Sequence, residues 1–197
     1  MADGVTRREF LKGTGAVITG VAMLDQSAAA ERGPGAAAAD SGQVEILLHV
    51  NGARRSVSVE PQMTLAEVLR GPLDLTGTKI GCDRGACSAC TVWLDREPVL
   101  SCMTLALDVG EREVVTIEGL AGGGRLHPVQ SAFIAQDAVQ CGFCTPGMVM
   151  SCAALLERNP DPSREDVKAA IAGHLCRCGT TPHVLDAVLE AAKAAKG

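Results

Sequence analysis

The stretch Cys82-Asp83-Arg84-Gly85-Ala86-Cys87-Ser88-Ala89-Cys90 carries three cysteines at C-x4-C-x2-C spacing, and a fourth, Cys102, follows after eleven intervening residues. This spacing is typical of sites that hold a 2Fe-2S cluster with four thiolates. Three thiolates from one loop must converge on a compact centre, so the backbone has to turn tightly. Glycine and the other small residues allow such turns and leave amide N–H groups free to point at sulfur. The sequence therefore predicts a 2Fe-2S cluster bound by Cys82, Cys87, Cys90 and Cys102.

Two other metal centres fit this first cysteine set less well. Structural zinc sites usually pair their ligands as two C-x2–4-C knuckles, and C-x4-C-x2-C with one distant cysteine does not match that pattern. A Rieske centre is disfavoured because no histidine replaces a cysteine in the set.

A second cysteine set lies further along the chain, with Cys141 and Cys144 at C-x2-C spacing and, after 31 intervening residues, Cys176 and Cys178 at C-x-C spacing. Each pair directly precedes a predicted helix start, at Thr145-Pro146 and Thr181-Pro182, so both helix dipoles could face a negatively charged cluster. Spacing alone leaves zinc, a redox dithiol and two disulfides open as alternatives.

The composition excludes some classes of protein. The chain has 197 residues with a net charge of −5, and it contains one Trp, three Phe and no Tyr, which argues against nucleic acid as a partner. Nine cysteines cannot all pair as disulfides. The ninth, Cys152, falls in a predicted helix and is expected to be a buried apolar residue.

The N-terminus has the order of an export signal. A basic cluster, Thr6-Arg7-Arg8-Glu9-Phe10-Leu11-Lys12, precedes a weakly apolar run over 13–24 that is too short to span a membrane, and small residues follow. The cluster resembles the twin-arginine signal, which directs proteins that are exported already folded. Residues 1–30 are therefore predicted to be a signal peptide for the periplasm, and 31–42 a low-complexity spacer. An ordinary Sec signal or a chance basic start is the alternative.

Residues 43–118 have the pattern of a small mixed sheet with one helix. Asn51-Gly52 separates two strand-like runs, 44–50 and 54–59, and predicts a hairpin. Thr64 begins a capping box for a short helix that ends at Gly71-Pro72. Further strands are expected at 91–95, 98–100 and 114–117, and Trp93 is expected in the core.

Residues 119–126 read as a flexible linker, and the hydrophobic period then becomes helical over 127–197. Four helices are expected, with starts at Pro128, Thr145, Ser163 and Thr181. Their apolar faces include Val129, Ala132, Phe133 and Gln136 in the first helix, Val167, Ala170, Ile171 and Leu175 in the third, and Val184, Leu185, Val188, Leu189 and Ala192 in the last. The four histidines, His49, His127, His174 and His183, are expected at the surface or in helix caps, because none falls into a spaced ligand set.

Three motifs together are similar to the small iron-sulfur subunit of the xanthine dehydrogenase and aldehyde oxidoreductase family of molybdenum hydroxylases. They are 77–92 (GTKIGCDRGACSACTV), 140–148 (QCGFCTPGM) and 175–180 (LCRCGT), and the match extends over about 44–190. The resemblance implies an α+β protein, in which a β-grasp 2Fe-2S ferredoxin domain precedes an all-α four-helix domain with a second 2Fe-2S cluster.

The resemblance also implies roles and partners. Cys141, Cys144, Cys176 and Cys178 would ligate the cluster nearest molybdenum, and Gln140, with Cys178, would lie toward the molybdopterin cofactor of a large partner subunit. Electrons would leave through the first cluster to a subunit that binds FAD or haem c. This chain itself would hold no substrate-oxidising site. Two other functions stay open: a free-standing two-cluster ferredoxin, and a secreted binding module stapled by zinc or disulfides.

This chain departs from the family pattern at three positions. Ser88 stands where the family commonly has glycine. Thr181 and His183 stand where a related motif has an aromatic residue and a cation.

Overall fold

The computed structural model describes residue 8 and residues 42–194. Except for Arg8 and Gly42, the predicted signal peptide and spacer lie outside the described residues. Residues 41–197 form one compact unit, and the description below concerns its residues 42–194. No helix in this described part of the chain is long and apolar enough to cross a lipid bilayer.

The predicted hairpin is present at the N-terminal end of this unit. Strand β1 (Val44–Val50) pairs antiparallel with β2 (Ala53–Val59), and both turn residues, Asn51 and Gly52, have positive φ angles of 52° and 74°. Positive φ at both central positions defines the turn type whose twist matches that of the strands. The short dipeptide was thus sufficient to fix the register of this hairpin.

Three further strands extend this hairpin into a mixed five-stranded sheet. They are β3 (Thr91–Leu94), β4 (Glu97–Leu100) and β5 (Glu113–Val115). The order is β2-β1-β5-β3-β4, with β1 and β5 parallel and the other neighbours antiparallel. The strand expected at 114–117 ends earlier than predicted, because the chain turns into the short helix α3 (Ile117–Leu120). That helix also occupies the start of the predicted linker.

Helix α2 (Leu65–Arg70) covers one face of the sheet. Both hydrogen bonds of the predicted capping box are present between Thr64 and Glu67, and the helix ends at Gly71 as expected. Between the helix and the sheet lies a core of aliphatic side chains, among them Leu48, Val59, Leu65, Val68 and Val92. The cap and the buried aliphatic face together account for a helix of only six residues.

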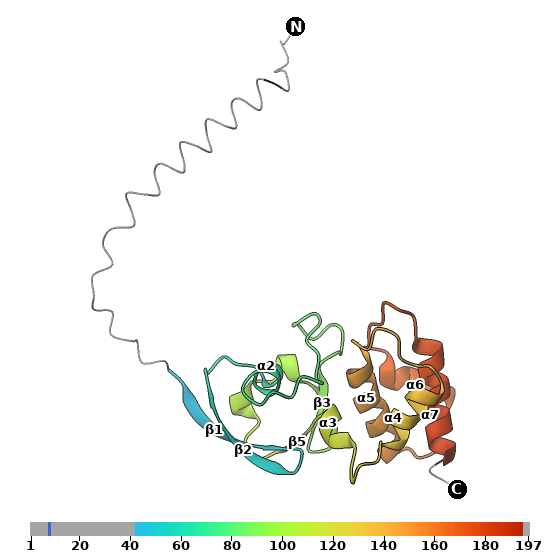
Figure 1. Ribbon diagram of the computed structural model, residues 1–197, viewed down its shortest axis with the longest axis horizontal. Helices are drawn as coiled ribbons and strands as arrows, with labels where there is room; N and C mark the ends of the chain where they lie inside the picture. Colours follow the sequence, from blue (N-terminus) through green and yellow to red (C-terminus); the bar gives the residue numbers. More distant parts are fainter. Residues whose placement is uncertain (1–7, 9–41, 195–197) are drawn as a thin grey trace, which may run out of the picture. The chain divides into compact units, whose positions relative to one another are not determined.

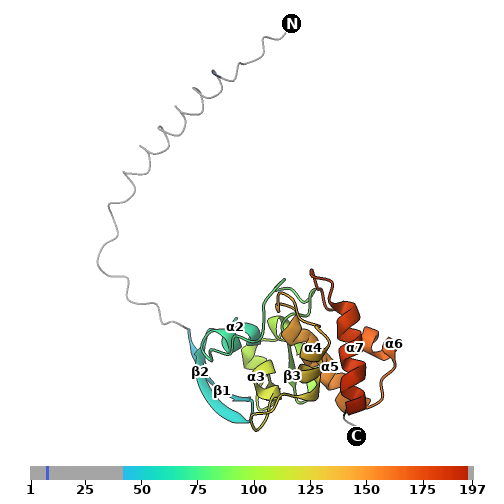
Figure 2. The ribbon, with the colours of Figure 1, turned by 45° about the vertical axis from the view of Figure 1, so that its right-hand side comes forward.

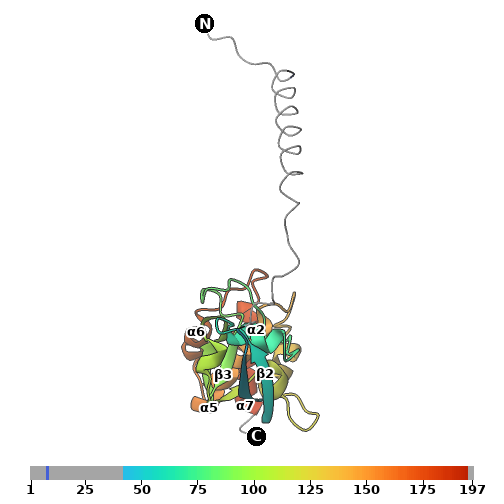
Figure 3. The ribbon, with the colours of Figure 1, turned by 90° about the vertical axis from the view of Figure 1, so that its left-hand side faces the viewer.

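Four helices make up the C-terminal half, as predicted: α4 (Pro128–Ala135), α5 (Thr145–Arg158), α6 (Arg164–Ile171) and α7 (Thr181–Ala194). In Figures 1 and 2 they gather beside β3, and Figure 3 shows them from the side of the sheet. Two loops carry the second cysteine set. Cys141 and Cys144 lie between α4 and α5, and Cys176 and Cys178 lie between α6 and α7. The helical half therefore places its cysteine loops at helix ends.

Two details of the helices differ from expectation, and a third agrees with it. Thr145 does not cap α5, since Cys144 occupies the N-cap position without a side-chain cap bond. Helix α6 ends at Ile171, so Leu175 is not part of its apolar face and is 66% exposed. His127 caps α4 as expected, because its Nδ1 accepts from the Val129 N–H at 3.3 Å.

The two halves are packed directly against each other. Trp93 of β3 is buried, and its indole N–H donates to the Met150 carbonyl oxygen of α5 at 2.8 Å. One helical turn earlier in α5, Gly147 lies against the first cysteine loop: a Cβ on Gly147 would be 2.3 Å from the Ser88 carbonyl oxygen. Only glycine allows the helix to approach this closely, because the obstacle is backbone.

Gly147→Ala should therefore destabilise the protein. Its new methyl group would press on the backbone of Ser88, and overpacking of this kind costs about 1–3 kcal/mol of unfolding free energy. Gly122→Ala is the matched control, because a Cβ there would meet nothing within 4 Å and its φ is not positive. Denaturant unfolding of both variants measures the difference, and equal stabilities would contradict the close approach.

Candidate iron-sulfur sites

The first cysteine set combines one loop with one hairpin. Cys82 and Cys87 lie in the loop between α2 and β3 and are half-buried, whereas Cys90 and Cys102 are buried. The β3–β4 hairpin places Cys90 directly before β3 and Cys102 just after β4, so the pairing of the two strands brings these distant cysteines together. Ser101 secures this junction, since its hydroxyl donates to the Cys90 carbonyl oxygen at 2.7 Å.

The four thiols of the first set form two pairs. Cys82 is within hydrogen-bonding reach of Cys87, and Cys102 of Cys90. A 2Fe-2S cluster has two irons and four protein thiolates. A grouping into two pairs thus suits two irons better than it suits a single metal ion.

Backbone N–H groups surround Cys82, as the small residues of the loop predicted. The pKa of Cys82 is lowered to about 7, chiefly by the N–H of Arg84, with a further contribution from the N–H of Ala86, which lies 3.2 Å from Sγ. Positive φ angles at Asp83, Gly85 and Ser88 turn the chain tightly around the thiols. By contrast, burial raises the pKa of Cys102 to about 11.

The second cysteine set is built from two loops that each lead into a helix. Cys141 and Cys144 precede α5, and Cys176 and Cys178 precede α7, as the sequence predicted. Here also the thiols form two pairs, Cys141 with Cys178 and Cys144 with Cys176. Each pair contains one cysteine from each loop, so the two loops must be held in register for either pair to form.

Hydrogen bonds and burial act differently on the thiols of the second set. Burial opposes ionisation of Cys176, but hydrogen bonds from the Thr180 hydroxyl, at 3.2 Å, and from backbone N–H groups outweigh it and lower the pKa to about 7. Burial is the main cause that raises the pKa of Cys144 to about 12. Cys141 is exposed, and the N–H of Phe143 lowers its pKa.

The arrangement of the thiols bears on the alternatives that cysteine spacing left open, which are zinc, a redox dithiol and two disulfides. All nine cysteines are free thiols, so the structure contains no disulfide between any of them. Within residues 42–194, no three or more Cys, His, Asp or Glu side chains are arranged to hold a single metal ion. Two thiol pairs supplied with N–H donors would suit a 2Fe-2S cluster at each site, and the eight cysteines stay its predicted ligands.

The two sites are connected through the backbone. The N–H of Leu175, the residue before Cys176, donates to the Cys87 carbonyl oxygen at 3.2 Å. The Phe143 ring reaches across to the first loop, where its Cε1 would lie 3.4 Å from a Cβ on Gly81. Sequence reasoning missed these contacts, because no local pattern relates position 87 to position 175.

The other residues singled out from the sequence lie as follows. Gln140 is exposed beside Cys141, and its proximity to a pterin stays a prediction. Cys152 is buried in α5, where burial raises the pKa of its thiol to about 12, so the expectation of a buried apolar residue is confirmed. Thr181 is the first residue of α7, and His183 is exposed with Nδ1 3.1 Å from the Gln136 carbonyl oxygen.

One histidine differs from the expectation of a surface or cap residue. His174 is half-buried; Nε2 of its ring lies 2.8 Å from the Ser151 hydroxyl, and burial lowers the pKa of the imidazole to about 4. Nothing in the local sequence marks this pair.

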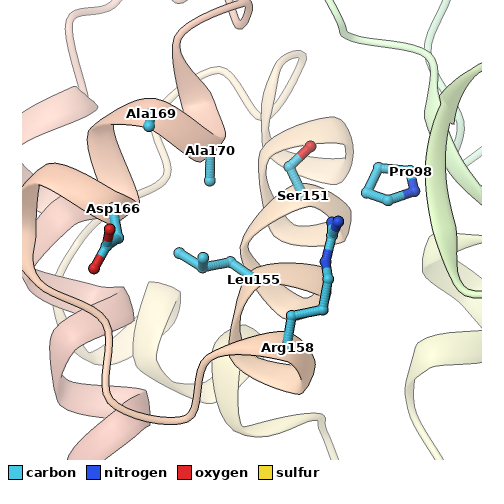
Figure 4. Close-up of a pocket in the computed structure, with 7 residues that line it drawn as sticks. All are labelled: Pro98, Ser151, Leu155, Arg158, Asp166, Ala169 and Ala170. Atoms are coloured by element: carbon cyan, nitrogen blue, oxygen red, sulfur yellow. The ribbon is translucent and has the colours of Figure 1, made fainter.

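A cavity of about 410 Å³ lies between β4, α5 and α6, and none of its lining residues is a cysteine (Figure 4). Its two charged groups already have partners. Arg158 forms an ion pair with Glu97 at 3.2 Å, and Asp166 accepts from Ser163 in the α6 cap. The cavity is therefore not part of either cysteine site.

Comparison with known proteins agrees with the two-site architecture. Residues 48–113 match the family model of the 2Fe-2S iron-sulfur cluster binding domain, and residues 116–189 match that of the 2Fe-2S binding domain. The fold and the two cysteine sets thus define a two-cluster iron-sulfur protein.

Individual relatives show which two-cluster iron-sulfur proteins this chain is similar to. The nicotine 6-hydroxylase small subunit of Paenarthrobacter nicotinovorans is 48% identical over 77% of this chain and 91% of its own length. The aldehyde oxidoreductase iron-sulfur-binding subunit PaoA of Escherichia coli K12 is 34% identical over 95% of this chain and 88% of its own. A chain in the crystal structure of quinoline 2-oxidoreductase from Pseudomonas putida 86 is 42% identical, with a TM-score of 0.76, over 79% of this chain and 98% of that one.

The protein belongs to the family of small iron-sulfur subunits of molybdenum hydroxylases, as the sequence motifs indicated. It is an electron-transfer subunit of a multi-subunit, molybdenum-dependent oxidoreductase.

Substitution of single cysteines should separate the two sites. Cys87→Ser and Cys176→Ser should each remove or strongly alter one of two electron paramagnetic resonance signals of the reduced protein, and each should affect a different signal. Cys152→Ala should leave both signals in place, because this thiol is buried in α5 and belongs to neither cysteine set. A change of both signals by either serine variant alone would contradict the assignment of ligands.

Proposed function

We propose that this chain relays electrons from a molybdopterin-binding large subunit to a subunit that carries FAD or haem c, during oxidation of an aldehyde or an N-heterocycle. The observation that carries the proposal is the presence of two complete sets of four cysteines joined by a direct backbone contact. Relatives named for nicotine, nicotinate, quinoline and aldehyde chemistry support the substrate classes.

Two sites in series suit this task for a reason of electron counting. Oxidation of the substrate releases two electrons per turnover, whereas a 2Fe-2S cluster bound at either site would accept and release one electron at a time. The residues of this chain keep the two sites close and supply N–H groups to the thiols, which favours the ionised form needed for ligation.

The second site is the better candidate for the side that faces the molybdenum subunit. Gln140 and Cys141 are exposed, and Phe143 is 47% exposed although it is a large apolar side chain. Exposed apolar groups beside a functional site are typical of surfaces that a partner covers. The predicted approach of Gln140 to the pterin requires this orientation.

Purification of the full chain with its companions tests the proposal. We expect a coloured complex that contains molybdenum, with about four iron and four acid-labile sulfide per copy of this chain, and two signals in the reduced state. Recovery as a monomer with both clusters but no molybdenum companion would favour a free-standing ferredoxin. A colourless protein would contradict both functions.

Flavin extraction and haem analysis of the same complex identify the acceptor, and a panel of aldehydes and N-heterocycles identifies the substrate class.

We also propose that the protein acts in the periplasm after twin-arginine export. A protein that must receive its iron before it crosses the membrane has to be exported folded, and Arg7-Arg8 with Phe10-Leu11-Lys12 fits that signal. The PaoA match covers 95% of this chain and so extends into the N-terminal residues 1–41.

Replacement of Arg7 and Arg8 by lysine should retain the protein in the cytosol, because the twin-arginine signal is read through its arginine pair. The matched control replaces Arg54 and Arg55 by lysine, an exposed arginine pair in β2. Cell fractionation followed by immunoblotting measures both. Unchanged export of the Arg7/Arg8 variant would refute this route.

A further inference from the structure

The segment that leads into Cys176 is held by three consecutive residues. Gly173 lies against Ser88, so close that a Cβ on Gly173 would be 2.9 Å from the serine hydroxyl. Leu175 donates its N–H to the Cys87 carbonyl oxygen at 3.2 Å. Between them, His174 turns to α5, where its Nε2 lies 2.8 Å from the Ser151 hydroxyl. The lead-in is thus tied to the first cysteine loop by its backbone and to α5 by one side chain.

The contact with Ser151 is the only hydrogen bond of the His174 ring among the described residues. Nδ1 of the ring is buried and has no hydrogen-bond partner there, and Ser151 itself is only 8% exposed. Figure 4 shows Ser151 on α5, one turn from Leu155, among the residues that line the cavity between β4, α5 and α6. Loss of the Ser151 hydroxyl would leave a half-buried imidazole without any polar partner and would remove the side-chain tie.

This contact connects the two loops of the second cysteine set. Cys144 is the N-cap of α5, and Ser151 lies two turns further along the same helix. His174 lies two positions before Cys176, with Leu175 between them. Because Cys144 and Cys176 form a thiol pair, the Ser151–His174 contact helps to fix the distance between the two halves of that pair.

We propose that Ser151 and His174 are a positioning pair that holds Cys176 in register with Cys144 and thereby sets the electronic environment of the second cluster. The pair does not touch substrate or ligate iron. This inference rests on the proposed two-cluster function, and it adds a role for two residues that lie outside both cysteine sets. The geometry and hydrogen bonding of ligating sulfurs tune the reduction potential of an iron-sulfur centre, so a shift in register should be measurable.

The test uses the full chain in its complex and compares Ser151→Ala with wild type. We expect a shift in the g-values and midpoint potential of the signal that Cys176→Ser removes, while the other signal and the iron content stay unchanged. His174→Leu should reproduce the shift. His174→Gln should restore most of the wild-type signal, because its amide can reach the Ser151 hydroxyl.

Two matched controls separate positioning from general packing. Cys152→Ala removes a buried atom from the neighbouring position of α5 but no hydrogen bond of the His174 ring, and it should move neither signal. Ser101→Ala removes a buried hydroxyl that donates to Cys90, so it should move only the first signal. The two serine variants should therefore each move a different signal and leave the other unchanged.

Several results would overturn the positioning pair. They are a Ser151→Ala protein in which neither signal moves, one in which both move equally, and a Cys152→Ala protein with the same shift. If Ser151→Ala fails to assemble, a His174→Gln protein that assembles but lacks the second signal also contradicts the proposal. A wild-type complex without two signals would instead overturn the proposed function itself.

Discussion

The structure depends on the close approach of two backbone segments, the loop 87–89 of the first cysteine set and the elements that carry the second set. Gly147 of α5 and Gly173 before Cys176 both face this loop, at distances that leave little or no space for a side chain. The Leu175 N–H can donate to Cys87 only because these glycines permit the approach. Since the contact is between backbones, it fixes the separation of the two sites more firmly than flexible side chains could.

The same region stores conformational strain. Asp83 and Ser88 have φ angles of 53° and 57°, a conformation that costs a non-glycine residue roughly 1–2 kcal/mol. The side chain of Ser88 is accommodated against Gly173. The Thr91 hydroxyl, which donates to the Ser88 carbonyl oxygen at 2.8 Å, helps to hold the turn. Strain of this kind persists only where the surroundings enforce it, and both cysteine sites depend on this turn.

Much of the local structure could be predicted because short patterns determine it. Asn51-Gly52 fixes a turn type, the Thr64–Glu67 box starts a helix, and the cysteine spacings predict the ligand sets. Predictions were wrong where tertiary contacts override local preference. Leu175 fits the apolar period of α6, yet the chain leaves the helix at Ile171, because this segment has to reach the carbonyl oxygen of Cys87. Thr145 is a good cap residue, but Cys144 occupies the cap position at the start of α5.

By itself, the sequence determined the order of sheet and helices and the family, and it predicted which eight cysteines act together, because each of these follows from residue types at short fixed spacings. Only the tertiary structure decided how the thiols pair within each set, that the two sites meet at Cys87 and Leu175, and that Ser151 holds His174. The thiol pairs of the second set and the contacts Cys87–Leu175 and Ser151–His174 join residues separated by 23 or more positions. No local pattern encodes them, because they arise from the packing of α5 against the first cysteine loop.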